Sequence, residues 1–520
     1  MAHLSGNDST PRTTAPTGGG SYRHILKYTS LFGMLQVLNM LINVIRSKAV
    51  ALLLGPAGTG LINIFTNIGS LMHQATNLGL PFSAVRSVSH LQAHGSQADC
   101  QAFAHTLRQW VLFTALCGGA LCLLAAVPIS LFTFSSSRYV PHICLLAPYV
   151  VLLALHGGEL ALLKGMKRLR MVALSSLAGT VGTLVVCITC YATLGMRGVV
   201  PSLLLSQLVI YLATLRYSHR VLPLRRPRFG TGWWHEGMPM VKLGLGFIAA
   251  GILGAGTDYV ISSLLNAWGG THEVGLYRCG YIMTVTYASM IFSAIEADFF
   301  PRLSACQDEM HEASHLINRQ IEVCAMLITP VLACFVTCMP LLVPLLYSSA
   351  YAAAVPMSVA ALLYMFFKAH TLPAAYLPLA KGDARIYLLS EFVYDLFMMV
   401  AVPLAFVRGG LLGAGMAIAA SGLLDFLFIH LFYHHRYGYT LRLQQPFYFV
   451  AQGALLVLLV AGTLAHRFGL LHLPVPLWLP SVLVCACSAG LAIHYLQRRT
   501  GIWQKIAARF HRHAKPKSYD

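Results

Sequence analysis

The sequence predicts an all-α polytopic membrane protein with about 14 transmembrane helices, arranged as two repeated six-helix lobes plus two C-terminal helices. Three observations lead to this prediction. Hydrophobic residues make up 57% of the chain and charged residues only 10%, whereas about 25% is usual for charged residues in soluble domains. Apolar runs of roughly twenty residues, long enough to cross a bilayer, recur along the chain. The second half also repeats short motifs of the first half.

Four motifs occur twice, at a spacing of 212 to 217 residues. They are Ser-Ser-x-Tyr, Lys-Gly-x-x-Arg, Gly-Leu and His-Arg. The copies begin at Ser136 and Ser348, Lys164 and Lys381, Gly60 and Gly275, and His219 and His435. Tandem repeats of hydrophobic helices are typical of transporters built from parallel repeats.

The apolar runs give the order of the expected spans. Their centres lie near Leu38, Ser70, Leu121, Val151, Gly182, Val209, Ile252, Ser289, Pro330, Leu363, Met398, Ser421, Val457 and Cys487. We therefore expect a disordered tail over residues 1–21, an N-lobe over 22–220, a linker over 221–240, a C-lobe over 241–436, two further spans over 437–500 and a basic amphipathic tail over 501–520. The longest connections are expected over 87–108, 216–240 and 301–320.

The basic residues indicate the orientation. With a cytoplasmic N-terminus, 28 Lys and Arg fall on the cytoplasmic side and six on the other, which predicts that both termini are cytoplasmic. The net charge of +19 therefore belongs to the borders of the spans, and we expect no nucleic-acid partner. The 13 cysteines are scattered through apolar runs, and no histidine set has metal-ligand spacing, so no metal and no cofactor is expected.

Polar side chains follow one face of each of the first two spans. They recur at spacings of three and four residues, which is the period of a helix face. The residues are Gln36, Asn39, Asn43 and Arg46 in the first span, and Asn63, Asn67, Ser70, Gln74 and Asn77 in the second. Such stripes form either hydrogen bonds between helices or the wall of a hydrophilic cavity. Their length favours the cavity.

Basic residues near the outer ends of these spans could bind a phosphate or a pyrophosphate. Arg46 and Lys48 end the first span, and Arg278 begins the eighth. An arginine can hold a phosphate with a two-pronged fork, and a lysine holds it as a point charge. The alternative is that Arg46 and Lys48 extend to the membrane interface.

Acidic residues within spans are concentrated in the second half of the chain. A charged group near the bilayer centre costs about 2.5 to 3.5 kcal/mol, so each needs a partner or a role. Glu159 is the exception in the first half. The ion-coupling candidates are Asp258, Glu296, Asp298, Lys368, Glu391, Asp395 and Asp425. These residues form either a structural ion-pair cluster or a site for a proton or a cation that couples transport to a gradient.

The stretch RSKAVALLLGPAGTGLINIFTNIGSLMHQATNLGLPFSAVRSVSHL, together with the duplicated motifs, resembles the polysaccharide and O-antigen flippases of the multidrug/oligosaccharidyl-lipid/polysaccharide exporter superfamily. The resemblance covers about residues 22–440. It implies a V-shaped pair of lobes in a bacterial inner membrane that flips undecaprenyl-pyrophosphate-linked glycan by alternating access, with H+ or Na+ as the coupling ion. The matching positions are the two polar stripes and Arg278 in GLYRCGY. Membrane lipids, a polysaccharide polymerase and chain-length machinery are the further partners that this function implies.

Three other functions remain open on the sequence. The two extra C-terminal helices resemble those of lipid II flippases. A drug or cation antiporter of the same superfamily would account for acidic residues in a cavity but not for the outer basic residues. A membrane glycan polymerase or ligase usually needs a large outer loop, and the outer loops expected here are mostly about ten residues or fewer.

Overall fold

The computed structural model describes residues 18–223, 233–287, 292, 299–306, 308–443, 446–470 and 478–500. Within these ranges the regular structure is entirely helical. The first half of the chain forms α1 (Gly18–Thr76), α2 (Leu80–His94), α3 (Gln97–Leu124), α4 (Ala126–Phe134), η1 (Ser137–Tyr139), α5 (Val140–Cys144), α6 (Ala147–Gly165), α7 (Leu169–Leu194), η2 (Gly195–Gly198) and α8 (Val199–Val221).

The second half repeats this arrangement and adds two helices. It comprises α9 (Trp233–Tyr281), the π-helical η3 (Ile282–Thr286), α11 (Met310–Leu346), η4 (Ser349–Ala354), α12 (Val355–Ala375), α13 (Leu377–Ala380), α14 (Ala384–Tyr437), α15 (Pro446–Arg467) and α16 (Trp478–Thr500). The predicted C-terminal tail over 501–520 and most of the predicted N-terminal tail lie outside the described residues.

Nine segments of the described chain are long and apolar enough to cross a membrane. Four of them contain two spans each, because the chain turns back at a glycine with positive φ, a conformation that glycine adopts without steric cost. These glycines are Gly55, Gly195, Gly270 and Gly410. The apolar part of α16, Ser481–Tyr495, completes the predicted 14 spans. We call the end of the bundle with these turns the Gly55 end, and the opposite end, where α1 meets α2, the Gly79 end.

The expected connection over 87–108 is helical for most of its length, which corrects the prediction of a loop. α2 continues to His94, and α3 begins at Gln97. Ser96 and Asp99 form a capping box that satisfies backbone groups at the start of α3. Likewise, α9 begins at Trp233, inside the expected linker, and α11 begins at Met310, inside the expected connection over 301–320. Polar composition marked where the chain leaves the hydrocarbon, but these helices continue beyond that point.

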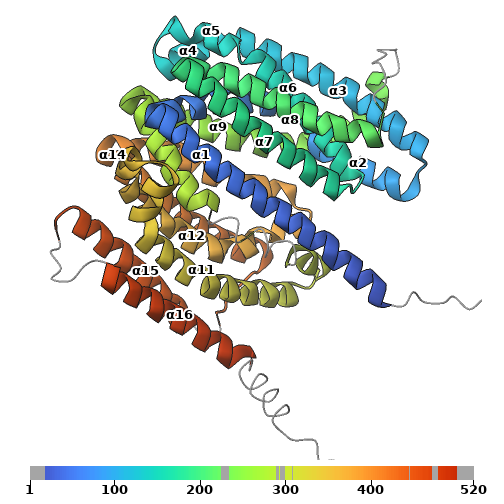
Figure 1. Ribbon diagram of the computed structural model, residues 1–520. Coiled ribbons are helices and arrows are strands. Elements are labelled where there is room, and N and C mark those ends of the chain that lie inside the picture. Colours follow the sequence, from blue (N-terminus) through green and yellow to red (C-terminus); the bar gives the residue numbers. More distant parts are fainter. Residues whose placement is uncertain are drawn as a thin grey trace, which may run out of the picture.

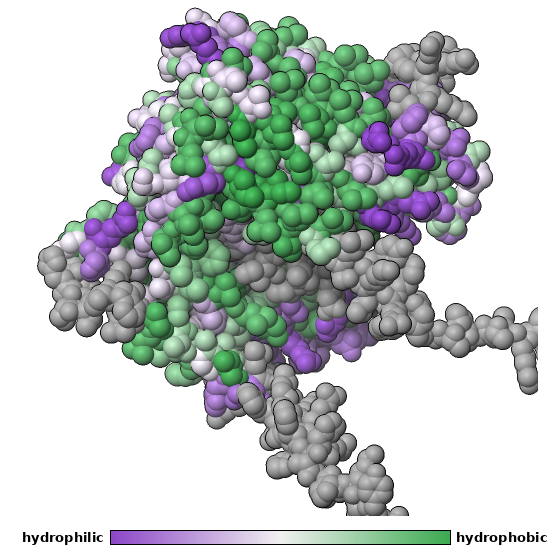
Figure 2. Space-filling view, in the orientation of Figure 1, coloured by the Kyte–Doolittle hydropathy of each residue, from purple (hydrophilic) through white to green (hydrophobic). Residues whose placement is uncertain are grey.

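The helices form two lobes with α1 and α9 between them (Figure 1). α3 to α8 lie on one side and α11, α12 and α14 on the other, while α15 and α16 pack against the outer face of α11. Figure 2 shows a broad apolar surface over the N-lobe, with hydrophilic residues gathered toward its two ends. Large apolar side chains such as Leu116, Leu124 and Val185 are exposed there. Such a band is expected where a helical bundle faces lipid.

Candidate functional site

A cavity of about 300 Å³ lies between the lobes, near the Gly55 end. Both halves of α1, with α7, α8 and the second half of α9, supply most of its wall. Because α1 turns back at Gly55, residues before and after the turn face the same space. Two guanidinium groups, those of Arg46 and Arg278, lie in the wall, and none of the described lining residues is acidic. We call this space the basic cavity.

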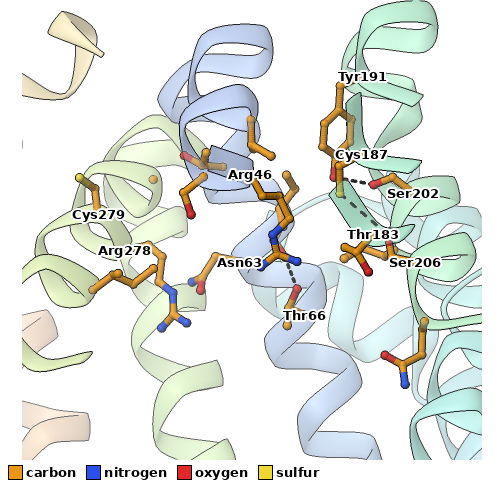
Figure 3. A pocket seen from close by; sticks show the side chains of 18 of the residues that line it. Arg46, Asn63, Thr66, Thr183, Cys187, Tyr191, Ser202, Ser206, Arg278 and Cys279 are labelled. Carbon is orange, nitrogen blue, oxygen red and sulfur yellow. Dashed lines mark hydrogen bonds between the residues drawn. The ribbon is translucent and has the colours of Figure 1, made fainter. Parts of the chain in front are cut away.

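Arg46, Asn63 and Arg278 come together in this cavity from three different spans. Figure 3 shows the Asn63 side chain between the two arginines. Asn63 is buried, and the Arg278 guanidinium lies 6.0 Å from the ring centroid of Tyr281. Two positive charges in the wall of one cavity attract anions, and arginine side chains suit phosphate oxygens in particular.

Several polar residues that line the basic cavity were not among the predicted site residues. They are Thr183, Cys187, Tyr191, Ser202, Ser206 and Gln207, on α7 and α8. The Thr183 hydroxyl, the Gln207 amide nitrogen and the Tyr347 hydroxyl are buried there without a hydrogen-bond partner. Since buried polar groups are nearly always hydrogen-bonded, these three atoms lack a partner that such groups normally have. The spacing of Thr183, Cys187 and Tyr191, four residues each, is the signal that would have identified this face.

The polar stripes do not form one continuous cavity wall. Asn67 donates hydrogen bonds to the Ser262 hydroxyl (2.9 Å) and to the Asp258 carbonyl oxygen (3.1 Å), so it joins α1 to α9. At the Gly79 end, Asn77 donates to Gln74 and accepts from the Gly79 amide, which fixes the turn into α2. These residues therefore act mainly in packing.

In the first half of α1, Asn39 is buried with both side-chain atoms unpartnered, and Asn43 donates to the Asn39 carbonyl oxygen at 3.0 Å. Lys48 donates to the Pro344 carbonyl oxygen at 3.1 Å and does not line the basic cavity beside Arg46. The side chains of Gln36, Glu296 and Asp298 lie outside the described residues.

The predicted charged residues of the C-lobe lie together on α12 and α14. The Lys368 ammonium is 3.7 Å from an Asp425 carboxylate oxygen and 5.8 Å from the ring centroid of Tyr394. Asp395 and Asp425 are buried, with 8% and 5% of their surfaces exposed. We call Lys368, Glu391, Asp395 and Asp425 the charged cluster. Asp258 on α9 is exposed and lies within electrostatic range of Arg278 and of Asp395.

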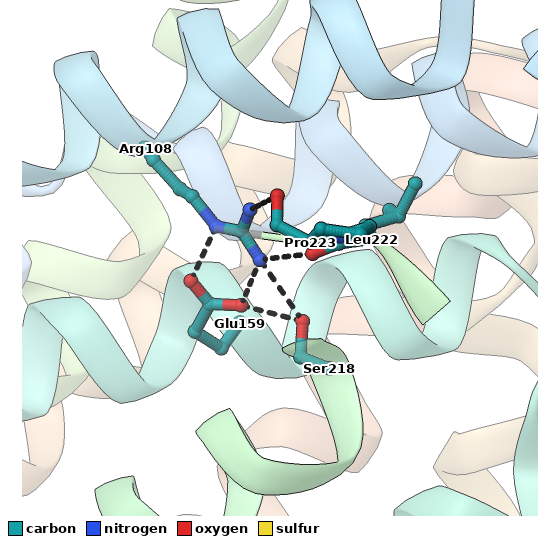
Figure 4. Close-up of polar contacts among 5 residues, drawn as sticks. All are labelled: Arg108, Glu159, Ser218, Leu222 and Pro223. Atoms are coloured by element: carbon teal, nitrogen blue, oxygen red, sulfur yellow. Dashed lines mark hydrogen bonds and ion pairs between the residues drawn. The ribbon is translucent and has the colours of Figure 1, made fainter. Parts of the chain in front are cut away.

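Glu159, the acid predicted within a span of the first half, is buried in a structural ion pair. Its two carboxylate oxygens accept from Arg108 at 2.7 and 2.9 Å, and the Ser218 hydroxyl donates to one of them (Figure 4). Arg108 also donates to the carbonyl oxygens of Leu222 and Pro223. The pair therefore fixes α3, α6 and the end of α8, where the chain leaves the N-lobe. Arg108 lies within α3, where the sequence had placed the end of a loop.

Two lobes of six spans, with a cavity where they meet, define the fold as a multi-pass membrane bundle built from a tandem repeat. Residues 49–356 match the model of the polysaccharide biosynthesis protein family, and the chain belongs to that family. No curated protein matches the chain.

Solved structures with this fold come from transporters of the MOP superfamily. The lipid II flippase MurJ in an inward closed conformation matches with a TM-score of 0.63 and 12% identity, over 90% of this chain and 99% of that one. An inward-facing multidrug resistance MATE family transporter of the MOP superfamily matches with a TM-score of 0.61 and 13% identity, over 76% of this chain and 94% of that one. The predicted fold is thus confirmed, as is the resemblance to the exporter superfamily.

Proposed function

We propose that the protein flips a polyprenyl-pyrophosphate-linked oligosaccharide, the repeat unit of O-antigen or another surface polysaccharide, across the bacterial inner membrane without changing it chemically. The observation that carries this proposal is the basic cavity, where Arg46 and Arg278 lie at a wall without a described acidic residue. A pyrophosphate can accept hydrogen bonds from both guanidinium groups. The unpartnered Thr183 and Gln207 atoms offer further polar contacts for a sugar.

The size of the cavity supports binding of part of the substrate only. A volume of about 300 Å³ is at the small end of ligand pockets, so it suits the pyrophosphate and the first sugar in this closed conformation. The rest of the glycan needs a more open state of the two lobes. Alternating access provides such a state, because a ligand that binds one conformation more tightly shifts the population toward it.

The orientation that we propose places both termini and the Gly79 end in the cytoplasm, following the excess of basic residues on that side. A reporter that is active only in the periplasm, fused after Asp520, should then be silent. Strong periplasmic activity of this fusion would overturn the orientation.

Lipid II flipping is the second candidate, since the match to the MurJ fold extends over 90% of the chain. Both substrates carry a polyprenyl pyrophosphate, so the protein can distinguish them only by the glycan that is attached. The test is a flipping assay in proteoliposomes with a fluorescent polyprenyl-pyrophosphate oligosaccharide, with lipid II and the oligosaccharide carrier as unlabelled competitors. We expect the oligosaccharide carrier to compete more strongly than lipid II.

A cationic dye serves as the control for drug export, and empty liposomes control for spontaneous flipping. If the dye is exported and the pyrophosphate lipid is not flipped, the proposal is wrong and the protein is an antiporter. If lipid II competes better than the oligosaccharide carrier, the peptidoglycan precursor is the substrate.

A further inference from the structure

A second basic pocket lies at the Gly79 end of the C-lobe, away from the basic cavity. It has a volume of about 500 Å³ and is formed by the start of α11 and the segment that follows α14. Its lining includes two histidines and two arginines, which are His311, His315, Arg319 and Arg442. The first three recur every four residues, so they lie on one face of α11. We call it the His/Arg pocket.

The wall of this pocket is built by buried hydrogen bonds. Asn318 donates to the Thr440 carbonyl oxygen at 2.9 Å and accepts from the Tyr439 hydroxyl at 2.8 Å. Tyr439 is fully buried. These contacts hold residues 438–442 against α11, and they place Arg442 opposite the histidines and Arg319. The pocket is therefore a fixed concave surface, in which two separate segments of the chain supply the positive charge.

The charges in the pocket are not neutralised within the described chain. His311, His315, Arg319 and Arg442 form no hydrogen bond or ion pair with any described residue. Glu322 is the one acid among the described lining residues, and it accepts a hydrogen bond from the Tyr495 hydroxyl of α16. Two guanidinium groups and two imidazoles outnumber the single described acid of this lining, so the pocket favours an anion.

The position of the pocket indicates where such an anion comes from. α11 has 37 residues, so at 1.5 Å per residue it is about 55 Å long, whereas the hydrocarbon core is about 30 Å thick. Its polar first turns therefore extend into the headgroup region. Basic pockets between helices at the cytoplasmic face commonly bind phosphate-bearing headgroups.

We propose that the His/Arg pocket binds a phosphate-bearing anion, through Arg319, Arg442 and the two histidines. The site is separate from the basic cavity, and it does not depend on the proposed flipping of a lipid-linked glycan. Its two possible sources are the headgroup of an anionic phospholipid and a soluble phosphate.

The test is ligand-dependent thermal unfolding of the purified full-length protein in neutral detergent. The probes are phosphatidylglycerol, phosphatidylcholine and inorganic phosphate, with chloride at the same ionic strength. We expect the wild type to be stabilised by phosphatidylglycerol, by phosphate or by both. Each of R319Q and R442Q should weaken the apparent Kd about fivefold, since a basic residue near an anionic surface contributes on the order of 1 kcal/mol. R385Q, an exposed arginine outside the pocket, is the matched control and should bind as the wild type does.

The probes distinguish the two possible sources of the anion, and the variants distinguish the His/Arg pocket from the basic cavity. A response to phosphatidylglycerol alone identifies a lipid headgroup, and a response to phosphate alone identifies a soluble ligand. R278A removes a charge from the basic cavity, so a response that survives in R278A and is lost in the R319Q/R442Q variant belongs to the His/Arg pocket. Equal responses of the wild type and the R319Q/R442Q variant overturn the proposal, as does a wild type that responds to neither probe. If that variant does not fold, H311Q/H315Q gives the same comparison at two exposed positions.

Discussion

Gly60 and Gly275 occupy equivalent positions in the two repeats and lie at the same contact between α1 and α9. A Cβ atom on Gly60 would be 1.8 Å from the Thr271 carbonyl oxygen, and a Cβ atom on Gly275 would be 1.9 Å from the Pro56 carbonyl oxygen. The two backbones therefore meet without an intervening side chain. The hydrogen bond between Thr59 and Tyr351, at 2.9 Å, flanks this contact. The two copies of the Gly-Leu motif therefore hold α1 and α9 in direct contact at the Gly55 end.

Gly275→Ala should open this contact. The new methyl group has no space against the Pro56 backbone, and overpacking of this kind costs about 1 to 3 kcal/mol. We expect faster amide hydrogen exchange over residues 56–62 and 271–279, because the two helices separate more often. The measurement is hydrogen exchange followed by mass spectrometry on the purified protein.

Gly254→Ala is the matched control, since it lies on the same helix and a Cβ atom there has no neighbour within 4 Å. It should leave exchange over both segments unchanged. Unchanged exchange in Gly275→Ala as well would show that the lobes do not rely on this close approach.

Arg278→Ala should abolish flipping, and Arg278→Lys should retain only part of it, because an ammonium group lacks the two-pronged geometry of the guanidinium. Arg46→Ala should weaken flipping in the same direction, since both groups line the basic cavity. The measurement is the proteoliposome assay, with surface expression quantified for each variant. Arg138→Ala removes an exposed arginine from the same end of the bundle, and this variant should flip the substrate as the wild type does. Wild-type flipping by Arg278→Ala would remove this arginine from the substrate site.

Glu159→Ala should destabilise the N-lobe by about 3 to 5 kcal/mol, because it leaves the Arg108 charge largely buried without its partner. Replacing both residues by leucine should recover much of this loss, since the cost arises from the unpaired charge. The measurement is the thermal unfolding of Glu159→Ala and of the four proteins of a double-mutant cycle, namely the wild type, Arg108→Leu, Glu159→Leu and the double variant. Glu273→Ala breaks a more exposed contact with His272 and should have little effect. Additive losses in the cycle would contradict a direct coupling of Arg108 and Glu159.

The repeat and the spans could be predicted because both depend on local sequence. The duplicated motifs and the long apolar runs are visible without any knowledge of packing. Lys368 and Asp425 were both among the candidates for an ion-pair cluster, and they form an ion pair. The two side chains reach the same depth because of the lengths of the neighbouring spans, and the sequence also determines these lengths.

Contacts between distant helices could not be predicted in the same way. Asn63 and Asn67 lie on the same face of α1, one turn apart, yet Asn63 lines the basic cavity and Asn67 bonds to α9. The difference depends on the position of Ser262, which lies 195 residues away. The pairing of Arg108 with Glu159 was missed for another reason. The connection between two spans was expected to extend to residue 108, whereas α3 begins at Gln97 and already includes Arg108.

The last prediction concerns ion coupling and distinguishes the two buried acids of the charged cluster. Lys368 neutralises Asp425, whereas Asp395 forms no ion pair in the described chain. A buried carboxylate without a counter-ion must bind a proton or a cation in some state of the transport cycle. Asp395→Asn should therefore give a stable protein that flips without responding to an imposed pH or Na+ gradient. Asp425→Asn should instead lower the thermal stability, because it leaves the Lys368 charge unpaired.

Both variants are measured in proteoliposomes with and without the gradient, beside Asp383→Asn. Asp383 pairs with the exposed Arg436 at 3.6 Å and caps α14, a role that asparagine can also fill, so this control should keep the gradient response. A gradient response in Asp395→Asn equal to that of the wild type would make the charged cluster structural. The coupling site would then have to include Asp258, which is exposed beside the cluster, or Glu296 and Asp298. Because Asp258 lies within electrostatic range of both Asp395 and Arg278, its substitution would test whether ion binding and substrate binding are linked through one carboxylate.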